Sequence, residues 1–354
     1  MKRTDFLKIT GAVFTGIFSG NLNKEITLSS SQDLPPLLLD TAGKPINNLQ
    51  EWNEHRKVII KRWSNYLGII DANNVPPELK ILNEEKNGSL MRQLVEYESE
   101  PGLRVKAYLL KPREIVTKLP AVVALHSTSD NQMKYIAGVE KGDIKALGYK
   151  LAGMGFVVIC PMCFLWHEKG DRTYEQQVEL FHLRHPLSKG MAKMLFDAMR
   201  AVDVLVNLEE VDSSRIGAVG HSLGGKEAFY LGAFDERVSV IVSNEGGIGI
   251  NFSNWDDPWY LGREIHDFHH EHHELLALCA PKPFLLIGGD SSDGKISVPY
   301  IEAVKPVYSL YGKPENIKLY NHGQGHNITP EAEKLTYEWM TGYLKDQPDR
   351  IKFP

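Results

Sequence analysis

The chain has 354 residues, of which 42% are hydrophobic and 24% are charged. This length and composition allow one large buried core, and the sequence shows no internal repeat and no low-complexity segment. The net charge of -5, without a long basic run, gives no reason to expect a nucleic acid or a membrane surface as partner.

The first residues, MKRTDFLKITGAVFTGIFSG, combine a basic start with an apolar stretch from about Ile9 to Phe18. That stretch is too short to span a bilayer as a mature helix, and a polar linker follows it. We therefore predict an export signal over residues 1–22 and a periplasmic or extracellular location. The segment is similar to a twin-arginine signal with Thr4 in place of the second arginine, which leaves the export route open. A buried N-terminal helix is the alternative.

Residues 23–90 are expected to form an N-terminal helical extension. Within it, Leu49 to Leu67 is typical of a charged helix, which the sequence PPELK ends. Two alternating runs follow, LMRQLVEYES and LRVKAYLLKP, and the Glu-Pro-Gly between them predicts a hairpin. The main domain is expected over residues 91–354.

Beyond the hairpin, apolar runs alternate with helical patterns. The runs are PAVVALH, FVVIC, RIGAVG, VSVIVS and KPFLLIG, and the helical segments include GMAKMLFDAMRAVDVLVNLE and KEAFYLGAF. This alternation predicts an α/β fold with a mostly parallel sheet and helices on both faces. The segment 244–275 is long, aromatic and rich in histidine, and we expect an ordered loop or a short cap insertion there.

The stretch IGAVGHSLGGKEAFY places Ser222 on a turn between a predicted strand and a predicted helix. A GxSxG turn of this kind is strained, and its glycines let strand and helix approach without Cβ clashes. The turn aims the hydroxyl and the backbone N–H of Leu223 at one spot, where an oxyanion would develop. A second N–H would come from Ser127 or Thr128, after PAVVALH. The alternatives are a serine that only caps the helix, and a polar turn at HSTSDN.

A nucleophilic serine needs a base, which should lie in the loop after the last strand. That loop carries His322 and His326, and we predict His326 as the base because it lies further into the loop. His322 is expected to brace the loop. An acid must orient the imidazole, and Asp290, Asp293 and Glu245 each follow a predicted strand. The residues alone do not choose among these three carboxylates.

Two stretches, GHSLGGKEAFYLGAFDERVSVIVSNEGGIG and HHELLALCAPKPFLLIGGD, resemble the α/β-hydrolase esterases of the acetylxylan esterase and dienelactone hydrolase type. They are particularly similar to the glucuronoyl esterases of carbohydrate esterase family 15, over residues 119–344. The resemblance implies the α/β-hydrolase fold, with Ser222 as nucleophile and His326 as base. It implies Glu245 as the acid, although some relatives place an aspartate after the FLLIG strand instead.

The same resemblance bears on the substrate. Lys226 matches a lysine that contacts sugar hydroxyls in that family, with a surface lysine as the alternative. Glucuronoyl esterases usually carry an arginine right after the nucleophile, where this chain has Leu223. A uronate ester is therefore less favoured, and an acetyl or other small acyl ester on a sugar becomes an equal candidate. No cofactor is implied.

The expected cap contains REIHDFHHEHHELL, with histidines at positions 266, 269, 270, 272 and 273. His269 and His273 would share a helical face, but the spacing HExxH is absent, which favours packing and substrate contact over a metal site. Upstream, Trp255, Trp259 and Tyr260 offer flat rings suited to the apolar faces of sugars. The alternative is that these rings pack the cap onto the domain.

We therefore expect an exported serine esterase that hydrolyses a carbohydrate ester, either a small molecule or a polysaccharide. No cofactor, metal or nucleic acid is expected, and no membrane in the mature form. A peptidase of the same fold and a non-catalytic sugar-binding relative are the alternatives. The short cap disfavours the first, and the presence of Ser222, His326 and three candidate acids disfavours the second.

Overall fold

The computed structural model describes residues 34–70, 77–129, 133–140, 146–346 and 353. The expected export signal lies outside these residues. Among the helices within them, none is long and apolar enough to cross a membrane.

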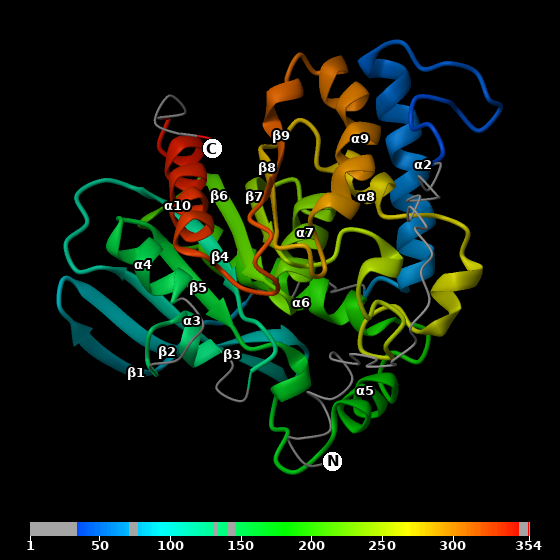
Figure 1. Ribbon diagram of the computed structural model, residues 1–354. Coiled ribbons are helices and arrows are strands. Elements are labelled where there is room, and N and C mark those ends of the chain that lie inside the picture. The colour runs from blue at the N-terminus through cyan, green and yellow to red at the C-terminus, as the bar shows by residue number, and fades with distance from the viewer. Residues whose placement is uncertain (1–33, 71–76, 130–132, 141–145, 347–352, 354) are drawn as a thin grey trace, which may run out of the picture. The chain divides into compact units, whose positions relative to one another are not determined.

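The centre of the fold is a nine-stranded sheet, counted over the described residues, with the order β1-β2-β3-β5-β4-β6-β7-β8-β9 (Figure 1). The strands are β1 (Lys80–Asn87), β2 (Leu90–Glu100), β3 (Leu103–Pro112), β4 (Leu119–Leu125), β5 (Val157–Pro161), β6 (Val211–His221), β7 (Val238–Asn244), β8 (Phe284–Gly288) and β9 (Ile317–Asn321). The first three strands pair antiparallel, as does β3 with β5, and all the other pairs are parallel. The predicted mostly parallel sheet is confirmed.

Helices cover both faces of this sheet. They are α2 (Leu49–Leu67), α3 (Met133–Ile136), α4 (Leu147–Gly153), α5 (Tyr174–His182), α6 (Gly190–Val206), α7 (Leu223–Phe234), α8 (His273–Leu278), α9 (Val298–Leu310) and α10 (Pro330–Leu344). Short 3-10 turns occur at Phe164–Trp166, Ile250–Phe252, Arg263–Asp267, Lys295–Ser297 and Pro314–Asn316. The core on one face combines α2 and α5 to α9, and the core on the other combines α3, α4 and α10.

Strand β4 shows why the central strands are apolar throughout. Its residues Ala121, Val123 and Leu125 join the core under α6 and α7, while Val122 and Ala124 join the core under α4 and α10. Successive side chains of a strand point to opposite faces, and both faces are covered here. A continuous apolar run is therefore what this position requires.

The sheet begins earlier than expected. Strand β1 pairs with β2, so the sheet starts at Lys80 and the expected boundary at residue 91 falls inside β2. The sequence KILNEEKN gave no signal because its residues, apart from Asn87, are exposed on both faces. The helix of the extension has the expected bounds, Leu49–Leu67, and Trp63 binds it to α8 by donating to Glu274 Oε2 at 2.8 Å.

The segment 244–275 is ordered without long helices. It contains two of the 3-10 turns and reaches the start of α8. Glu271 holds it together, since its Oε1 atom accepts the N–H of Ile250 at 3.0 Å and the N–H of His272 at 2.7 Å. The segment therefore folds as an ordered loop, which we call the cap.

Candidate active site

Five loops bring the predicted site residues to one edge of the sheet. Ser127 follows β4, Ser222 follows β6, Glu245 follows β7, Asp293 follows β8 and His326 follows β9. These strands are parallel, so their carboxyl ends meet at the same edge, where open α/β sheets bind ligands. The topology thus gathers residues that are up to two hundred positions apart in the chain.

Ser222 occupies a strained turn. Its φ of 59° and ψ of -120° lie outside the regions that residues with side chains favour. The turn is tight because a Cβ at Gly220 would lie 2.1 Å from the carbonyl oxygen of Gly224, and one at Gly224 would lie 2.1 Å from that of Leu125. Backbone strain of this kind is retained where the surrounding structure enforces it. Both glycines are therefore required by close backbone approach, as the sequence predicted.

The backbone N–H of Leu223 is available beside this serine. Leu223 is the first residue of α7, and an N–H in the first turn of a helix has no partner within the helix. Its side chain is buried, so only the backbone can face a ligand. The loop of Ser127 is tied to the same place, because Ser127 Oγ lies 2.9 Å from His221 Nδ1 and 3.0 Å from His221 O.

His326 is hydrogen-bonded to Glu245. The Nδ1 atom of His326 lies 3.0 Å from Glu245 Oε2, and the same oxygen accepts the N–H of Ser292 at 2.7 Å. Glu245 Oε1 accepts the N–H of Gly289. Burial acts to raise the pKa of Glu245, but the hydrogen bonds from His326 and from these N–H groups outweigh it and lower the pKa. The carboxylate is thus ionised, buried and held in place.

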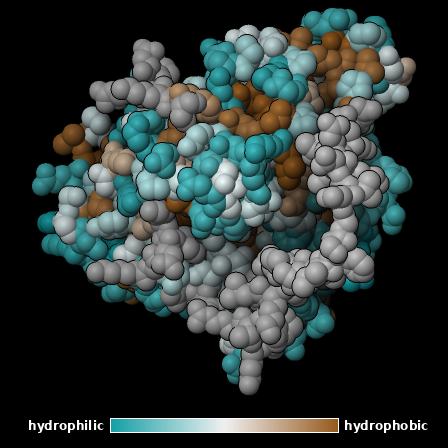
Figure 2. Space-filling view, in the orientation of Figure 1, coloured by the Kyte–Doolittle hydropathy of each residue, from teal (hydrophilic) through white to brown (hydrophobic). Residues whose placement is uncertain are grey.

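The ring of His326 lies beside the nucleophile turn. Its centroid is 4.8 Å from that of His221, the residue directly before Ser222. The loop after β9 crosses the centre of the view in Figure 1, where Figure 2 shows mainly hydrophilic atoms, and the His326 side chain is 40% exposed. Among the described residues, no hydrogen bond joins Ser222 Oγ to His326. Such contacts often tighten only when substrate binds.

The two aspartates after β8 have other partners. Asp293 is fully buried, and its carboxylate accepts the N–H groups of Gly247 at 2.7 Å and Ile248 at 2.8 Å and the hydroxyl of Ser297 at 2.9 Å. Burial raises the pKa of Asp293 to about 6, against the effect of these bonds. Asp293 therefore holds the backbone after Glu245 rather than a histidine.

Asp290 lies at the surface of the same loop. It accepts the N–H of Lys295 at 2.9 Å and the amide of Asn321 at 2.8 Å. His322 Nδ1 accepts the N–H of Gln324 at 3.1 Å, so His322 braces its loop as expected. The hydrogen bond of His326 to an acid is made with Glu245 and with neither aspartate.

Lys226 and Trp255 are not placed to meet a sugar, contrary to expectation. The Lys226 side chain is buried, and its Nζ atom donates to the carbonyl of Gly246 at 2.6 Å. Trp255 is fully buried and covers that nitrogen, with 4.1 Å from Nζ to the ring centroid. The cap folds back over α7 and removes both side chains from solvent. For Trp255 this is the alternative named from the sequence, in which its ring packs the cap onto the domain.

A pair of half-buried rings lies nearby. Tyr174, at the start of α5, and Trp259, in the cap, have ring centroids 5.8 Å apart. Trp166 connects Tyr174 to His126, the residue before Ser127, with centroid distances of 5.2 and 5.1 Å. Sequence reasoning missed α5, although the Thr173 capping box that begins it was a usable signal.

The histidines of the cap have separate partners. His266 faces Asp256 at 3.6 Å, and His270 faces Glu274 at 3.0 Å. The buried His272 pairs with the Tyr230 hydroxyl at 2.8 Å, and burial holds its pKa well below the ordinary range. Across the described residues, no group of three or more His, Cys, Asp or Glu side chains is arranged to hold a metal ion. Of these contacts, the one between His272 and Tyr230 packs the cap onto α7.

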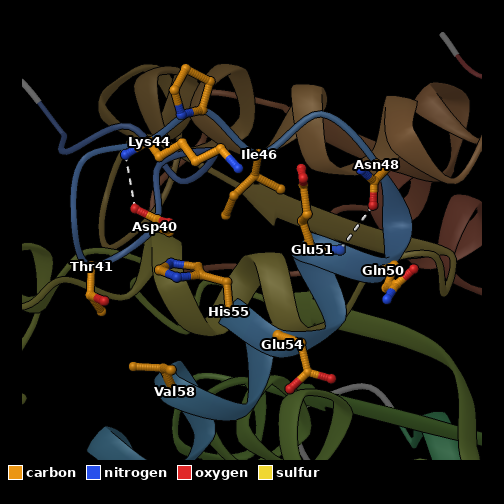
Figure 3. Close-up of a pocket in the computed structure, with 11 residues that line it drawn as sticks. Asp40, Thr41, Lys44, Ile46, Asn48, Gln50, Glu51, Glu54, His55 and Val58 are labelled. Carbon is orange, nitrogen blue, oxygen red and sulfur yellow. Dashed lines mark hydrogen bonds between the residues drawn. The ribbon is translucent and has the colours of Figure 1, made fainter.

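A pocket of about 530 Å³ opens beside the first turns of α2 (Figure 3). It is lined by Asp40, Thr41, Lys44, Pro45, Ile46, Asn48, Gln50, Glu51, Glu54, His55 and Val58. Its shape comes from the segment before α2, where Asp40 Oδ1 accepts the N–H of Lys44 at 2.8 Å. None of the site residues described above lines it, so it is a separate feature of the surface.

Similarity to known proteins supports the fold and the family. A family model described as the Dienelactone hydrolase family matches residues 105–328, which is more than half of the chain. The chain is 26% identical to YtaP of Bacillus subtilis (strain 168), named as a hydrolase, over 74% of this chain and 91% of that protein. It is 23% identical to the 4-O-methyl-glucuronoyl methylesterase of Phanerochaete carnosa (strain HHB-10118-sp), over 44% of this chain and 47% of that protein.

Among solved structures, the glucuronoyl esterase from Solibacter usitatus matches with a TM-score of 0.69 and 19% identity, covering 91% of this chain and 99% of that one. The likeness to esterases that the sequence indicated is thereby confirmed. The chain belongs to the dienelactone hydrolase family and is a hydrolase with the α/β-hydrolase fold.

Proposed function

We propose that the protein is an exported serine esterase that hydrolyses a carbohydrate ester, with Ser222 as nucleophile, His326 as base and Glu245 as acid. The observation that carries this proposal is the 3.0 Å hydrogen bond between His326 and Glu245, at the sheet edge where Ser222 occupies its strained turn. A base oriented by a buried carboxylate beside a partly exposed serine is the arrangement that activates a hydroxyl.

In the first half of the reaction, Ser222 Oγ attacks the ester carbonyl carbon while its proton passes to His326 Nε2. The carbonyl oxygen becomes an oxyanion, and the N–H groups of Leu223 and of the Ser127 loop donate to it. The oxyanion then collapses and the bond to the leaving oxygen breaks. That oxygen takes the proton from His326, so an alcohol departs and the acyl group remains on Ser222.

In the second half, water attacks the acyl-enzyme carbonyl and gives its proton to His326. The same N–H groups hold the second oxyanion. When it collapses, Ser222 Oγ leaves and recovers the proton, and a carboxylic acid is released. Glu245 keeps the imidazole in the correct tautomer and stabilises its charged form throughout, without itself becoming protonated.

The substrate class is inferred from the relatives and from the site. Relatives named for glucuronoyl esters favour a sugar ester. The half-buried rings of Tyr174 and Trp259 are linked through Trp166 to His126, next to Ser127, which favours their contact with the sugar. With Leu223 buried where those esterases usually have an arginine, the oxyanion would rest on backbone N–H groups alone. An acetyl ester and a glucuronoyl ester therefore both remain candidates.

The test is hydrolysis of p-nitrophenyl acetate, acetylated xylan and a methyl glucuronate ester by purified protein. Ser222→Ala should abolish the activity, and Ser309→Ala, which removes a hydroxyl that bonds only within α9, should not. Wild-type activity that survives in Ser222→Ala would overturn the proposal. The preferred ester identifies the acyl group.

Export is tested separately. Expression of the full chain should release protein lacking the first residues into the periplasm or medium, whereas a chain without residues 1–22 should stay inside the cell. Intact N-termini on the full-length product, found by mass spectrometry of the cell lysate, would contradict an export signal.

A further inference from the structure

The backbone turn that carries Glu245 is held from two sides by buried charged groups. On one side, Lys226 Nζ donates to the carbonyl of Gly246 at 2.6 Å. On the other side, Asp293 accepts the N–H groups of Gly247 at 2.7 Å and Ile248 at 2.8 Å. Backbone groups of three consecutive residues directly after Glu245 are thus bonded to side chains from α7 and from the loop after β8.

The turn after Glu245 has an unfavourable backbone conformation, which other contacts must stabilise. Glu245 has a φ of 52°, a left-handed conformation that is unfavourable for a residue with a long side chain. Gly247, two residues later, has a φ of 79°. A strained turn keeps its conformation only when contacts with the surrounding structure enforce it. The position of the Glu245 carboxylate relative to His326 therefore depends on these contacts.

Lys226 links that turn to the nucleophile. It lies four residues after Ser222, one turn further along α7, and the Lys226 N–H donates to the carbonyl of Ser222 at 3.1 Å. Helix and turn touch closely, since a Cβ on Gly225 would lie 2.9 Å from the carbonyl oxygen of Asn244. Lys226 thus fixes the spacing between the helix of the nucleophile and the residue next to the acid.

The surroundings of the Lys226 nitrogen leave it no route to a substrate. Its side chain is 3% exposed, and the rings of Trp255 and Tyr260 lie 4.1 and 5.1 Å from Nζ. Trp255 itself is bonded to the same turn, donating from Nε1 to the carbonyl of Gly247 at 2.7 Å. Both the ammonium and the neutral amine can donate to Gly246, so the contact does not require the charge.

We propose that Lys226, together with Asp293, is a positioning residue that holds the Glu245 turn in register with His326, and is not a sugar contact. This role rests on the proposed function, because it has meaning only if Glu245 orients the base. It predicts that loss of Lys226 lowers the turnover of every ester alike, whereas a sugar contact would matter only for esters that contain a sugar.

The test compares Lys226→Met with the wild type on p-nitrophenyl acetate, which has no sugar, and on the sugar ester that the enzyme prefers. We expect kcat to fall by roughly 10- to 100-fold on both substrates, with little change in KM, as for a small misplacement of a catalytic group. Lys282→Met is the matched control. Lys282 is a largely buried lysine, with its side chain 10% exposed, that also donates to backbone carbonyls, those of Gly232 at 2.8 Å and Asp235 at 2.9 Å, at the far end of α7.

A spectroscopic measurement reports on the same contact without turnover. An imidazole N–H bonded to a carboxylate gives a far-downfield proton resonance, which Glu245→Gln should abolish. We expect this resonance to be lost or broadened in Lys226→Met and retained in Lys282→Met. Should Lys226→Met not fold, Asp293→Asn tests the other half of the same clamp and should give the same two effects.

Two outcomes would overturn the inference. One is a raised KM for the sugar ester with unchanged kcat on p-nitrophenyl acetate, which is the behaviour of a sugar contact. The other is an unchanged downfield resonance and unchanged kcat in Lys226→Met. If instead the proposed function is wrong, the Ser222→Ala variant will keep its esterase activity, which is a different result from either of these two outcomes.

Discussion

Glu245 and His326 are joined by a 3.0 Å hydrogen bond although they lie on loops after different strands, β7 and β9. Strand β8 lies between β7 and β9, so the Glu245 side chain crosses the end of β8. There it accepts a hydrogen bond from the N–H of Gly289. The acid therefore sits one strand earlier than Asp290 and Asp293, and a glutamate has the longer reach that this crossing needs.

Glu245→Gln should lower kcat by about 10⁴-fold, because a neutral amide cannot hold the imidazole tautomer or stabilise its charged form. Asp293→Asn should cost only about 10-fold, since it weakens the support of the turn and leaves the acid in place. Steady-state kinetics on p-nitrophenyl acetate would measure both. The reverse ranking of the two variants would assign the acid to Asp293.

The nucleophile turn should not tolerate a larger residue. Gly224→Ala would put a Cβ 2.1 Å from the carbonyl oxygen of Leu125, so either α7 or β4 must shift. We expect the free energy of unfolding to fall by about 3 kcal/mol and the activity to be lost. Gly153→Ala is the control, because it lies at the end of α4 with nothing within 4 Å of the added Cβ.

Urea unfolding followed by circular dichroism would measure both glycine variants. Gly153→Ala should leave activity unchanged and stabilise the protein by up to about 1 kcal/mol, as alanine is the better helix former. Equal effects of the two substitutions would show that close approach at the turn is not what selects glycine there.

Much of this site could be predicted because its signals are local. The helix Leu49–Leu67 has the predicted bounds, and in the structure Asn48 caps its start and Gly68, with a φ of 61°, ends it before the PPELK sequence is reached. The GxSxG motif likewise predicts the conformation of its turn, and the strand and helix on either side each have a clear apolar pattern. Such features depend on residues that are close together in the chain, so they can be recognised from the sequence alone.

What failed depends on packing between distant segments. The sequence could not choose between Glu245 and Asp293, because both follow adjacent parallel strands and only the directions of the side chains differ. Lys226 was expected either at a sugar or at the surface, yet the cap buries it against Trp255. Burial is a tertiary property, and polar or amphipathic residues in an irregular segment give no periodicity from which to infer it.

Trp259 and Trp255 should respond differently to truncation. Trp259→Ala removes a half-buried ring, and we expect KM for the sugar ester to rise by roughly 3- to 10-fold while p-nitrophenyl acetate is cleaved as before. Trp255→Ala removes a fully buried ring and should lower the free energy of unfolding by about 3 to 5 kcal/mol. A loss of both activities in Trp259→Ala would mean that its ring supports the fold instead of a substrate.

The free energy of unfolding should fall in mild acid, because two histidines next to site residues, His126 and His221, are buried in the neutral form. Burial lowers the pKa of His126 to about 4, and burial with the nearby His326 and His322 lowers that of His221 to about 3. The ordinary value is 6.5, so between pH 6.5 and 4 the unfolded chain binds protons that the folded chain excludes. The free energy of unfolding must then fall as the pH falls.

Asp293 acts in the opposite direction. Its pKa of about 6 lies above its ordinary value of 3.8, so in that interval the folded state binds a proton that the unfolded state does not. Asp293 thus offsets one of these two histidines, while the buried His272, whose pKa is also lowered, acts in the same direction as they do. We therefore expect the free energy of unfolding to fall with a measurable slope between pH 6 and 4. Urea unfolding at pH 7, 6, 5 and 4 measures this slope. His221→Asn should make the slope shallower by the contribution of about one proton. If the stability of the wild type instead rose toward pH 4, these histidines would be protonated in the folded protein.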